Sequence, residues 1–152
     1  MKNTMAWMCF AAGLATVWSM PASSQVRPEQ QVRQRQAGMI LQGKYFYPIR
    51  NQAQGKIPYD PKIVARNVTY LDQLARMPWD GFTPATKGVE SRATPAVLTD
   101  ASKFKEAQDQ FMAESAKLAE LVRKGDEAAT RQQILAVDNS CNNCHDAFRE
   151  RR

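Results

Sequence analysis

Apolar side chains recur at intervals of three and four residues in four separate stretches of the chain, which is the pattern of amphipathic helices. The positions that share one face are, in chain order, Val32, Gln36, Met39, Gly43 and Phe46; Ile63, Asn67, Tyr70, Leu74 and Met77; Phe104, Phe111, Leu118 and Val122; and Ile134, Val137, Cys141, Cys144 and Phe148. No stretch alternates apolar and polar residues with the period of two that indicates a strand. We therefore expect helices and no sheet.

Turn-forming residues bound the second of these helices. Asp60 followed by Pro61 is a good helix start, because the carboxylate can accept the free amides of the first turn and proline is preset for its first position. Pro78 cannot continue a helix, so we expect this helix to stop just before it.

Further turn-forming residues mark the start of the third helix and its separation from the fourth. A long connection rich in Gly, Pro, Thr and Ser spans 79–99, and the third helix opens near Asp100. Lys124 suits a helix C-terminus, Gly125 suits the left-handed residue after it, and Asp126 can cap the next helix. Four amphipathic helices with mostly short links predict an all-α fold, an antiparallel up-and-down four-helix bundle.

The N-terminal segment has the features of a secretory signal peptide in the usual order. Lys2 precedes an apolar run at 5–17, and small residues at 22–24 precede Gln25. The run is shorter than the roughly 20 residues of a membrane-spanning helix, although a retained N-terminal anchor is the alternative. Cys9 lies inside the apolar run, which argues against a lipid-anchored cysteine.

Cleavage before Gln25 would divide the chain into a signal peptide at 1–24 and one domain at 25–152. It removes one lysine and no acid, which lowers the basic count from 21 to 20 and the net charge from +6 to +5. The remaining basic residues are scattered and form no stripe of the kind that nucleic-acid binding needs. The charge supports only a weak attraction to acidic partners.

Two cysteines and the only histidine of the chain stand together in the sequence CNNCH, from Cys141 to His145. Cys-x-x-Cys-His is the attachment motif of c-type haem. Each thiol can add to one vinyl group of the porphyrin, and the adjacent imidazole can reach the iron. The motif therefore predicts one covalently bound haem c inside the bundle.

Three other uses of this motif fit less well. A structural disulfide would leave the histidine unexplained and would close a tight loop within a helix. A thioredoxin-like dithiol belongs at a helix N-terminus beside a sheet, where the helix dipole lowers the thiol pKa. Zinc needs a fourth ligand, and the mature chain has no further cysteine or histidine to supply it.

Six short motifs are spread over the whole mature chain. In chain order they are RQAGM at 35–39, PYD at 58–60, MPWDGF at 77–82, SKF at 102–104, KGDEAA at 124–129 and CNNCHDAFR at 141–149. In this order they resemble the cytochrome c′ family of class II c-type cytochromes, which are four-helix bundles. One departure is PAVLT at 95–99, where the family often has a tryptophan. The resemblance implies a periplasmic protein.

The resemblance also implies contacts with the haem. Cys141 and Cys144 are implied as the thioether attachments and His145 as the proximal iron ligand. Arg149, one turn further, resembles the family's arginine beside the proximal imidazole; a solvated tail charge is the alternative.

Three further haem contacts are implied outside the last helix. Arg35 and Gln36 match a pair that contacts polar groups of the haem, where an arginine could neutralise a propionate. Glu90 falls near the point where the family's connecting segment touches the haem.

Met39 matches the family position that faces the iron from the distal side, and three roles are open to it. It can be core filling, a sixth iron ligand that gives a low-spin electron carrier, or a steric plug over a five-coordinate iron that admits small gases. The PWDGF segment looks more like the five-coordinate members. We therefore favour a cytochrome that binds NO and CO and takes part in electron transfer, with the six-coordinate electron carrier as the alternative.

Two further expectations concern enzymatic activity and assembly. An enzyme such as a peroxidase is not expected, since the apolar distal face offers no second histidine as an acid–base group. The resemblance suggests a homodimer through the first two helices, for which Tyr45, Tyr47 and Ile49 would supply surface. The redox partner protein stays unknown.

Overall fold

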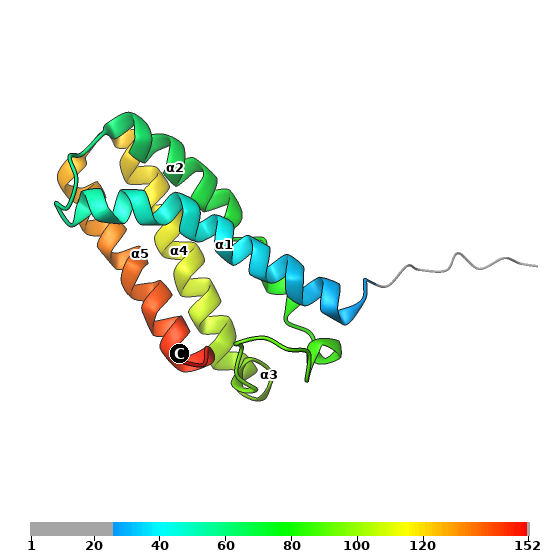
Figure 1. The fold of residues 1–152 in the computed structure, drawn as a ribbon. Coiled ribbons are helices and arrows are strands. Elements are labelled where there is room, and N and C mark those ends of the chain that lie inside the picture. Colours follow the sequence, from blue (N-terminus) through cyan, green and yellow to red (C-terminus); the bar gives the residue numbers. More distant parts are fainter. Residues whose placement is uncertain (1–25, 152) are drawn as a thin grey trace, which may run out of the picture.

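The computed structural model describes residues 26–151, so the expected signal peptide lies outside the described residues. The helices are α1 (Pro28–Ala53), α2 (Pro61–Leu74), α3 (Ala96–Thr99), α4 (Ala101–Lys124) and α5 (Glu127–Phe148), with 3₁₀ turns η1 (Trp79–Gly81) and η2 (Pro84–Thr86) in the connection. The four long helices pack together, and the short α3 lies beside the start of α4 and the end of α5 (Figure 1). The predicted all-α four-helix bundle is confirmed.

The local signals for the helix ends act as expected. Asp60 accepts hydrogen bonds from the amides of Lys62 (2.8 Å) and Ile63 (3.2 Å). Gly125 has a φ of +73° after α4. The carboxylate of Asp126 accepts from the amide of Ala129 at 2.9 Å and caps α5.

The expected inward face and end of the second helix were partly wrong. The helix ends at Leu74, and its buried residues are Val64, Asn67, Val68 and Leu71. Tyr70 and Met77 are 42% and 58% exposed. The Gln42 side chain donates to the Leu74 carbonyl at 2.8 Å, which satisfies one of the carbonyls that a helix end leaves free.

The bundle core consists of tightly packed aliphatic and aromatic side chains from all four long helices. Its most buried apolar members, at 0–1% exposure, are Ile49, Val64, Val68, Leu71, Ala75, Leu118, Ile134 and Val137. The expectation that Ile49 supplies surface is therefore wrong. Ile49 lies three residues after Phe46 on the same inner face of α1, whereas Tyr47 is 55% exposed.

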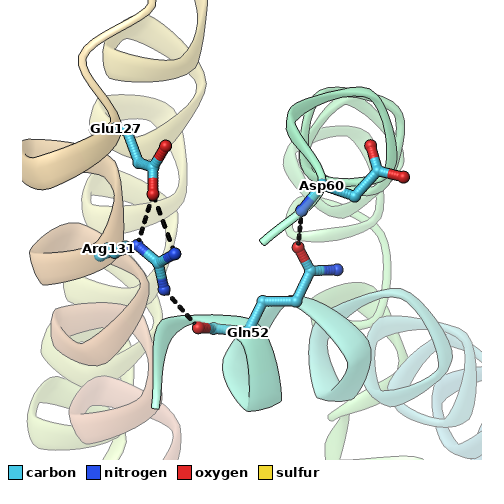
Figure 2. Close-up of polar contacts among 4 residues, drawn as sticks. All are labelled: Gln52, Asp60, Glu127 and Arg131. Atoms are coloured by element: carbon cyan, nitrogen blue, oxygen red, sulfur yellow. Dashed lines mark hydrogen bonds and ion pairs between the residues drawn. The ribbon is translucent and has the colours of Figure 1, made fainter. Parts of the chain in front are cut away.

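A polar cluster closes the end of the bundle where α1 stops and α5 begins (Figure 2). Arg131 donates to the backbone carbonyl of Gln52 and pairs with Glu127 at 2.8 Å. The buried side-chain oxygen of Gln52 accepts from the amide of Asp60 at 2.7 Å. These bonds join α5, the end of α1 and the start of α2, so this end of the bundle is fixed.

Ile134→Ala is expected to lower the free energy of unfolding by about 2–5 kcal/mol, because it leaves a cavity in a core position that is 0% exposed. Leu135→Ala is the matched control, since this neighbouring side chain is 37% exposed. Chemical denaturation of the purified holoprotein measures both. Equal losses for the two variants would contradict the packing described for α5.

Candidate cofactor-binding site

A cavity of about 430 Å³ lies between α1, α4, α5 and the connection. Its size is within the range of small-molecule and cofactor sites, about 300–1,000 Å³. Most of its wall is apolar, and the apolar side chains include Trp79, Phe82, Val97, Phe104, Phe111 and Phe148. The cavity can therefore take a large flat apolar group.

The two cysteines of the CNNCH motif line this cavity from α5. They are free and half-buried, one helical turn apart. Burial, with the charges of Asp138 and Cys144 adding to it, raises the pKa of Cys141 to about 12. Burial also raises the pKa of Cys144, although the positive charge of Arg149 acts in the opposite direction. Both groups are therefore thiols at neutral pH, unlike the thiolates of a reactive dithiol.

His145 lies beside them on the same wall. Burial, together with the charges of Arg149 and Arg92, lowers the pKa of His145, and Asp146 opposes that effect. The imidazole is therefore neutral at pH 7, which is the form that binds a metal.

The donor set fits a covalent haem. Two half-buried thiols and a neutral imidazole line an apolar cavity from one turn of helix, which suits two thioether bonds and one iron ligand. Across residues 26–151, no group of three or more His, Cys, Asp or Glu side chains is placed to hold a metal ion directly. A zinc site built on this motif would need such a group.

An aromatic cluster forms the wall of the cavity near α4. Phe104 packs against Phe82 and Phe148 with ring centroids 4.9 and 5.1 Å apart. Trp79 lies 6.3 Å from Phe104 and donates its indole N–H to the carbonyl of Ala75 at 2.7 Å. Sequence analysis placed Phe104 and Phe148 on inward helix faces but did not assign these rings to the site.

The segment that lacks the family's tryptophan still covers the cavity. Val97 is only 9% exposed and lines the cavity, and Leu98 packs against the same apolar cluster. Aliphatic side chains therefore fill this edge.

Arg35 holds the connection against α1. It is 5% exposed, and its guanidinium donates to the Gly81 carbonyl at 2.8 Å and to the hydroxyls of Thr86 and Ser91 at 3.2 and 3.1 Å. It also lies over the ring of Phe82, 4.3 Å from the centroid, and lines the cavity. Burial lowers the pKa of Arg35, and its hydrogen bonds offset the cost of burying the charge.

Arg35→Gln is expected to destabilise the protein by about 2–4 kcal/mol, because it removes several charge-assisted hydrogen bonds from a buried position. The connection should also become easier to cleave by a protease. Arg33→Gln is the control, since Arg33 is exposed on the same helix. Denaturation and limited proteolysis measure both effects, and an Arg35 variant as stable as the control would contradict the role of this contact.

The other predicted contact residues are not all at the cavity. Gln36, Met39 and Arg149 line it, the first and last being exposed and Met39 half-buried. Glu90 is exposed and does not line it. The next residue of the connection, Ser91, does line it.

The chain is similar to known cytochromes over most of its length. The family model "Cytochrome C'" matches residues 30–149. The cytochrome c' of Halomonas halodenitrificans is 38% identical over 128 residues, which cover 80% of this chain and 97% of the relative. The relative from Rubrivivax gelatinosus is 35% identical over 126 residues, with 82% and 98% covered.

Solved structures agree with these similarities. The crystal structure of cytochrome c' from Rubrivivax gelatinosus has a TM-score of 0.78 and 35% identity, covering 82% of this chain and 98% of that one. A nitric oxide complex of a cytochrome c prime variant from Alcaligenes xylosoxidans has a TM-score of 0.77 and 33% identity, with 84% and 98% covered.

Proposed function

The chain belongs to the cytochrome c′ family, and on that premise we propose that its haem iron is five-coordinate, binds small gases such as NO and CO, and takes part in electron transfer. Proteins of this family bind one covalent c-type haem, which supplies an iron that can take up a diatomic gas or an electron. One observation carries the proposal: the CNNCH motif of α5 and Met39 of α1 line one largely apolar cavity.

The residues on α5 would hold the haem. Cys141 and Cys144 would form its thioether bonds, and the neutral imidazole of His145 would bind the iron. Their position on one helical turn supports this assignment.

Arg149 places a positive charge beside the proximal imidazole. Two observations support this role: Arg149 and His145 line the same cavity, and the amide of Arg149 donates to the His145 carbonyl at 3.0 Å. Arg35 and Gln36 stand at the α1 wall, where the haem carboxylates are the partners we propose for them.

Met39 would act as a steric plug that limits access to the iron from α1. It comes from a different helix, is half-buried, and lines the cavity with apolar neighbours. An apolar plug excludes water and bulky ligands while a small gas can displace it.

Gas binding also has support from relatives. Solved structures of cytochrome c prime from Alcaligenes xylosoxidans include a nitric oxide complex and a carbon monoxide-bound variant. The described residues that line the cavity include no carboxylate and no second imidazole. His145 and the two cysteines are assigned to the haem, which leaves no other side chain of the lining suited to general acid–base work. We therefore propose a binding and electron-transfer protein rather than an enzyme.

A six-coordinate electron carrier is the second candidate. It rests on the same placement, since Met39 lines the cavity that also holds His145, and a thioether is a known axial ligand. Titration of the ferrous protein with carbon monoxide separates the candidates. The first predicts saturable binding with a large spectral change, and an iron already closed by Met39 predicts no binding at moderate gas concentration.

The native protein is expected to have the mass of residues 25–152 plus one haem, because we propose export with cleavage before Gln25 and a periplasmic location. Intact-mass spectrometry of protein from its own cells tests this, with and without reduction as a control for mixed disulfides. A mass that includes 1–24 would contradict it. Within 26–151, none of the helices has the length and apolarity needed to cross a bilayer.

A homodimer through α1 and α2 is proposed as well. These helices expose Leu41, Tyr47 and Tyr70, and the Tyr45 ring packs against Tyr70 with centroids 4.8 Å apart. Exposed apolar groups on neighbouring helices suit an interface. Sedimentation equilibrium of wild type and Tyr47→Glu tests it, and a monomeric wild type would refute it.

A further inference from the structure

The segment after α5 pairs with the connection before α3, and this pairing lies at the cavity wall. Ala93 and Arg149 form an isolated antiparallel bridge. The amide of Thr94 donates to the carbonyl of Phe148 at 3.0 Å. Ala93, Phe148 and Arg149 all line the cavity, so the pairing shapes the wall next to His145.

Arg92 binds the backbone of Glu150, the residue after Arg149, at both its amide and its carbonyl. The amide of Glu150 donates to the carbonyl of Arg92 at 2.9 Å. The guanidinium of Arg92 in turn donates to the carbonyl of Glu150. The charge-assisted hydrogen bond from the Arg92 side chain thus reinforces the backbone hydrogen bond between Arg92 and Glu150.

These contacts fix the backbone on both sides of Arg149. Arg149 leaves the helix with φ −128° and ψ +134°, an extended conformation. Its predecessor Phe148 is held by Thr94 and its successor Glu150 by Arg92. The direction of the Arg149 side chain therefore depends on the pairing and not on α5 alone.

We propose that Arg92 is a positioning residue that clasps the tail and so keeps the Arg149 guanidinium beside the iron-binding imidazole. This inference rests on the proposed ligation of the iron by His145. A positive charge next to the axial ligand favours the reduced iron, because the ferrous form carries one positive charge fewer. Arg92 thereby raises the reduction potential through Arg149.

The charged groups around His145 are placed consistently with this role. The amide of Arg149 donates to the His145 carbonyl at 3.0 Å, so Arg149 follows the imidazole by one turn. Arg92 and Arg149 both line the cavity with His145. The neighbouring carboxylate of Asp146 is exposed and pairs with Arg151 at 3.7 Å.

A double-mutant cycle on the holoprotein tests the proposal, because it isolates the coupling between two residues. The variants are Arg92→Gln, Arg149→Gln and the double variant, with Arg123→Gln as control. Arg123 is an exposed arginine in the last turn of α4, outside the cavity. Spectroelectrochemical titration gives each reduction potential, and amide hydrogen exchange reports the backbone bond of Glu150.

Arg92→Gln is expected to lower the ferric-to-ferrous equilibrium constant at least threefold, a tenfold change being about 59 mV for one electron. In the Arg149→Gln background the same substitution should shift the potential by less than half as much. The Glu150 amide should exchange at least threefold faster in Arg92→Gln and at the wild-type rate in Arg123→Gln.

An unchanged potential in Arg92→Gln, an undiminished shift in the Arg149→Gln background, or an unchanged exchange rate would each overturn the proposal. These results are distinct from a failure of the proposed function. A wild type without covalent haem or without histidine ligation would refute that function before the cycle begins. Normal wild-type spectra with an uncoupled cycle would refute only the role of Arg92.

Discussion

Replacement of both Cys141 and Cys144 by alanine is expected to abolish covalent haem attachment completely. The two thiols are the only ones in the part of the chain that the structure describes, and each supplies one thioether bond. Acid–acetone extraction should remove all colour from any haem that the double variant retains, whereas the wild type should keep its colour. Each single alanine variant should keep one thioether and give a lower yield of holoprotein.

Asn142→Ala is the matched control for these variants. Asn142 lies between the two cysteines but is exposed and does not line the cavity. It should retain full covalent haem. The loss of haem on extraction of the wild type, or its retention in the double variant, would contradict the assignment of these thiols.

Met39→Ala is expected to speed carbon monoxide binding to the ferrous protein substantially, by tenfold or more if the plug adds about 1.4 kcal/mol to the entry barrier. The side chain is half-buried at the cavity, so its removal clears the α1 side of the haem. Stopped-flow or flash photolysis measures the rate. The iron should be high-spin in both the wild type and the variant.

Two further variants separate steric from bonding effects of this methionine. Met77→Ala removes a methionine that is 58% exposed and does not line the cavity, so gas binding should be unchanged. Met39→Leu keeps an apolar side chain of similar size without the sulfur, so binding should stay slow. A Met39→Leu variant that binds gas as fast as Met39→Ala would contradict a purely steric role.

Sequence signals that act over a few residues predicted the structure well. Asp60, Gly125 and Asp126 cap or end helices as expected, because capping involves only backbone groups within one turn. The family motif likewise places Cys141 and Cys144 on one turn of α5, since a spacing of three is also a helical spacing.

Features that depend on contacts between distant segments were missed. Asn67 was correctly expected on the inward face of α2, and its side chain donates to the Tyr45 carbonyl at 3.0 Å. The expected face also included Tyr70 and Met77, whereas the apolar residues that α2 buries are Val64, Val68 and Leu71. The direction of this face depends on how α2 packs against α1 and α4, which local spacing does not determine. The expectation that Ile49 is exposed was an error of another kind. Its spacing of three residues from Phe46 already places it on the inner face of the helix.

The connection shows the same limit within the site. Its placement depends on Arg35, whose hydrogen-bond partners lie 46, 51 and 56 residues away along the chain. No local pattern in the connection indicates that a buried arginine would organise it. The sequence therefore predicted a long irregular segment but did not identify Ser91 and Arg92 as residues that line the cavity.

The optical and electron paramagnetic resonance spectra of the wild-type protein test the open iron position most directly. We expect a high-spin ferrous protein, and an oxidised protein without the near-infrared band of a methionine–iron bond. Met39→Ala should leave the spin state unchanged. A low-spin wild type that becomes high-spin in Met39→Ala would show that Met39 is the sixth ligand, and would contradict the five-coordinate gas-binding site.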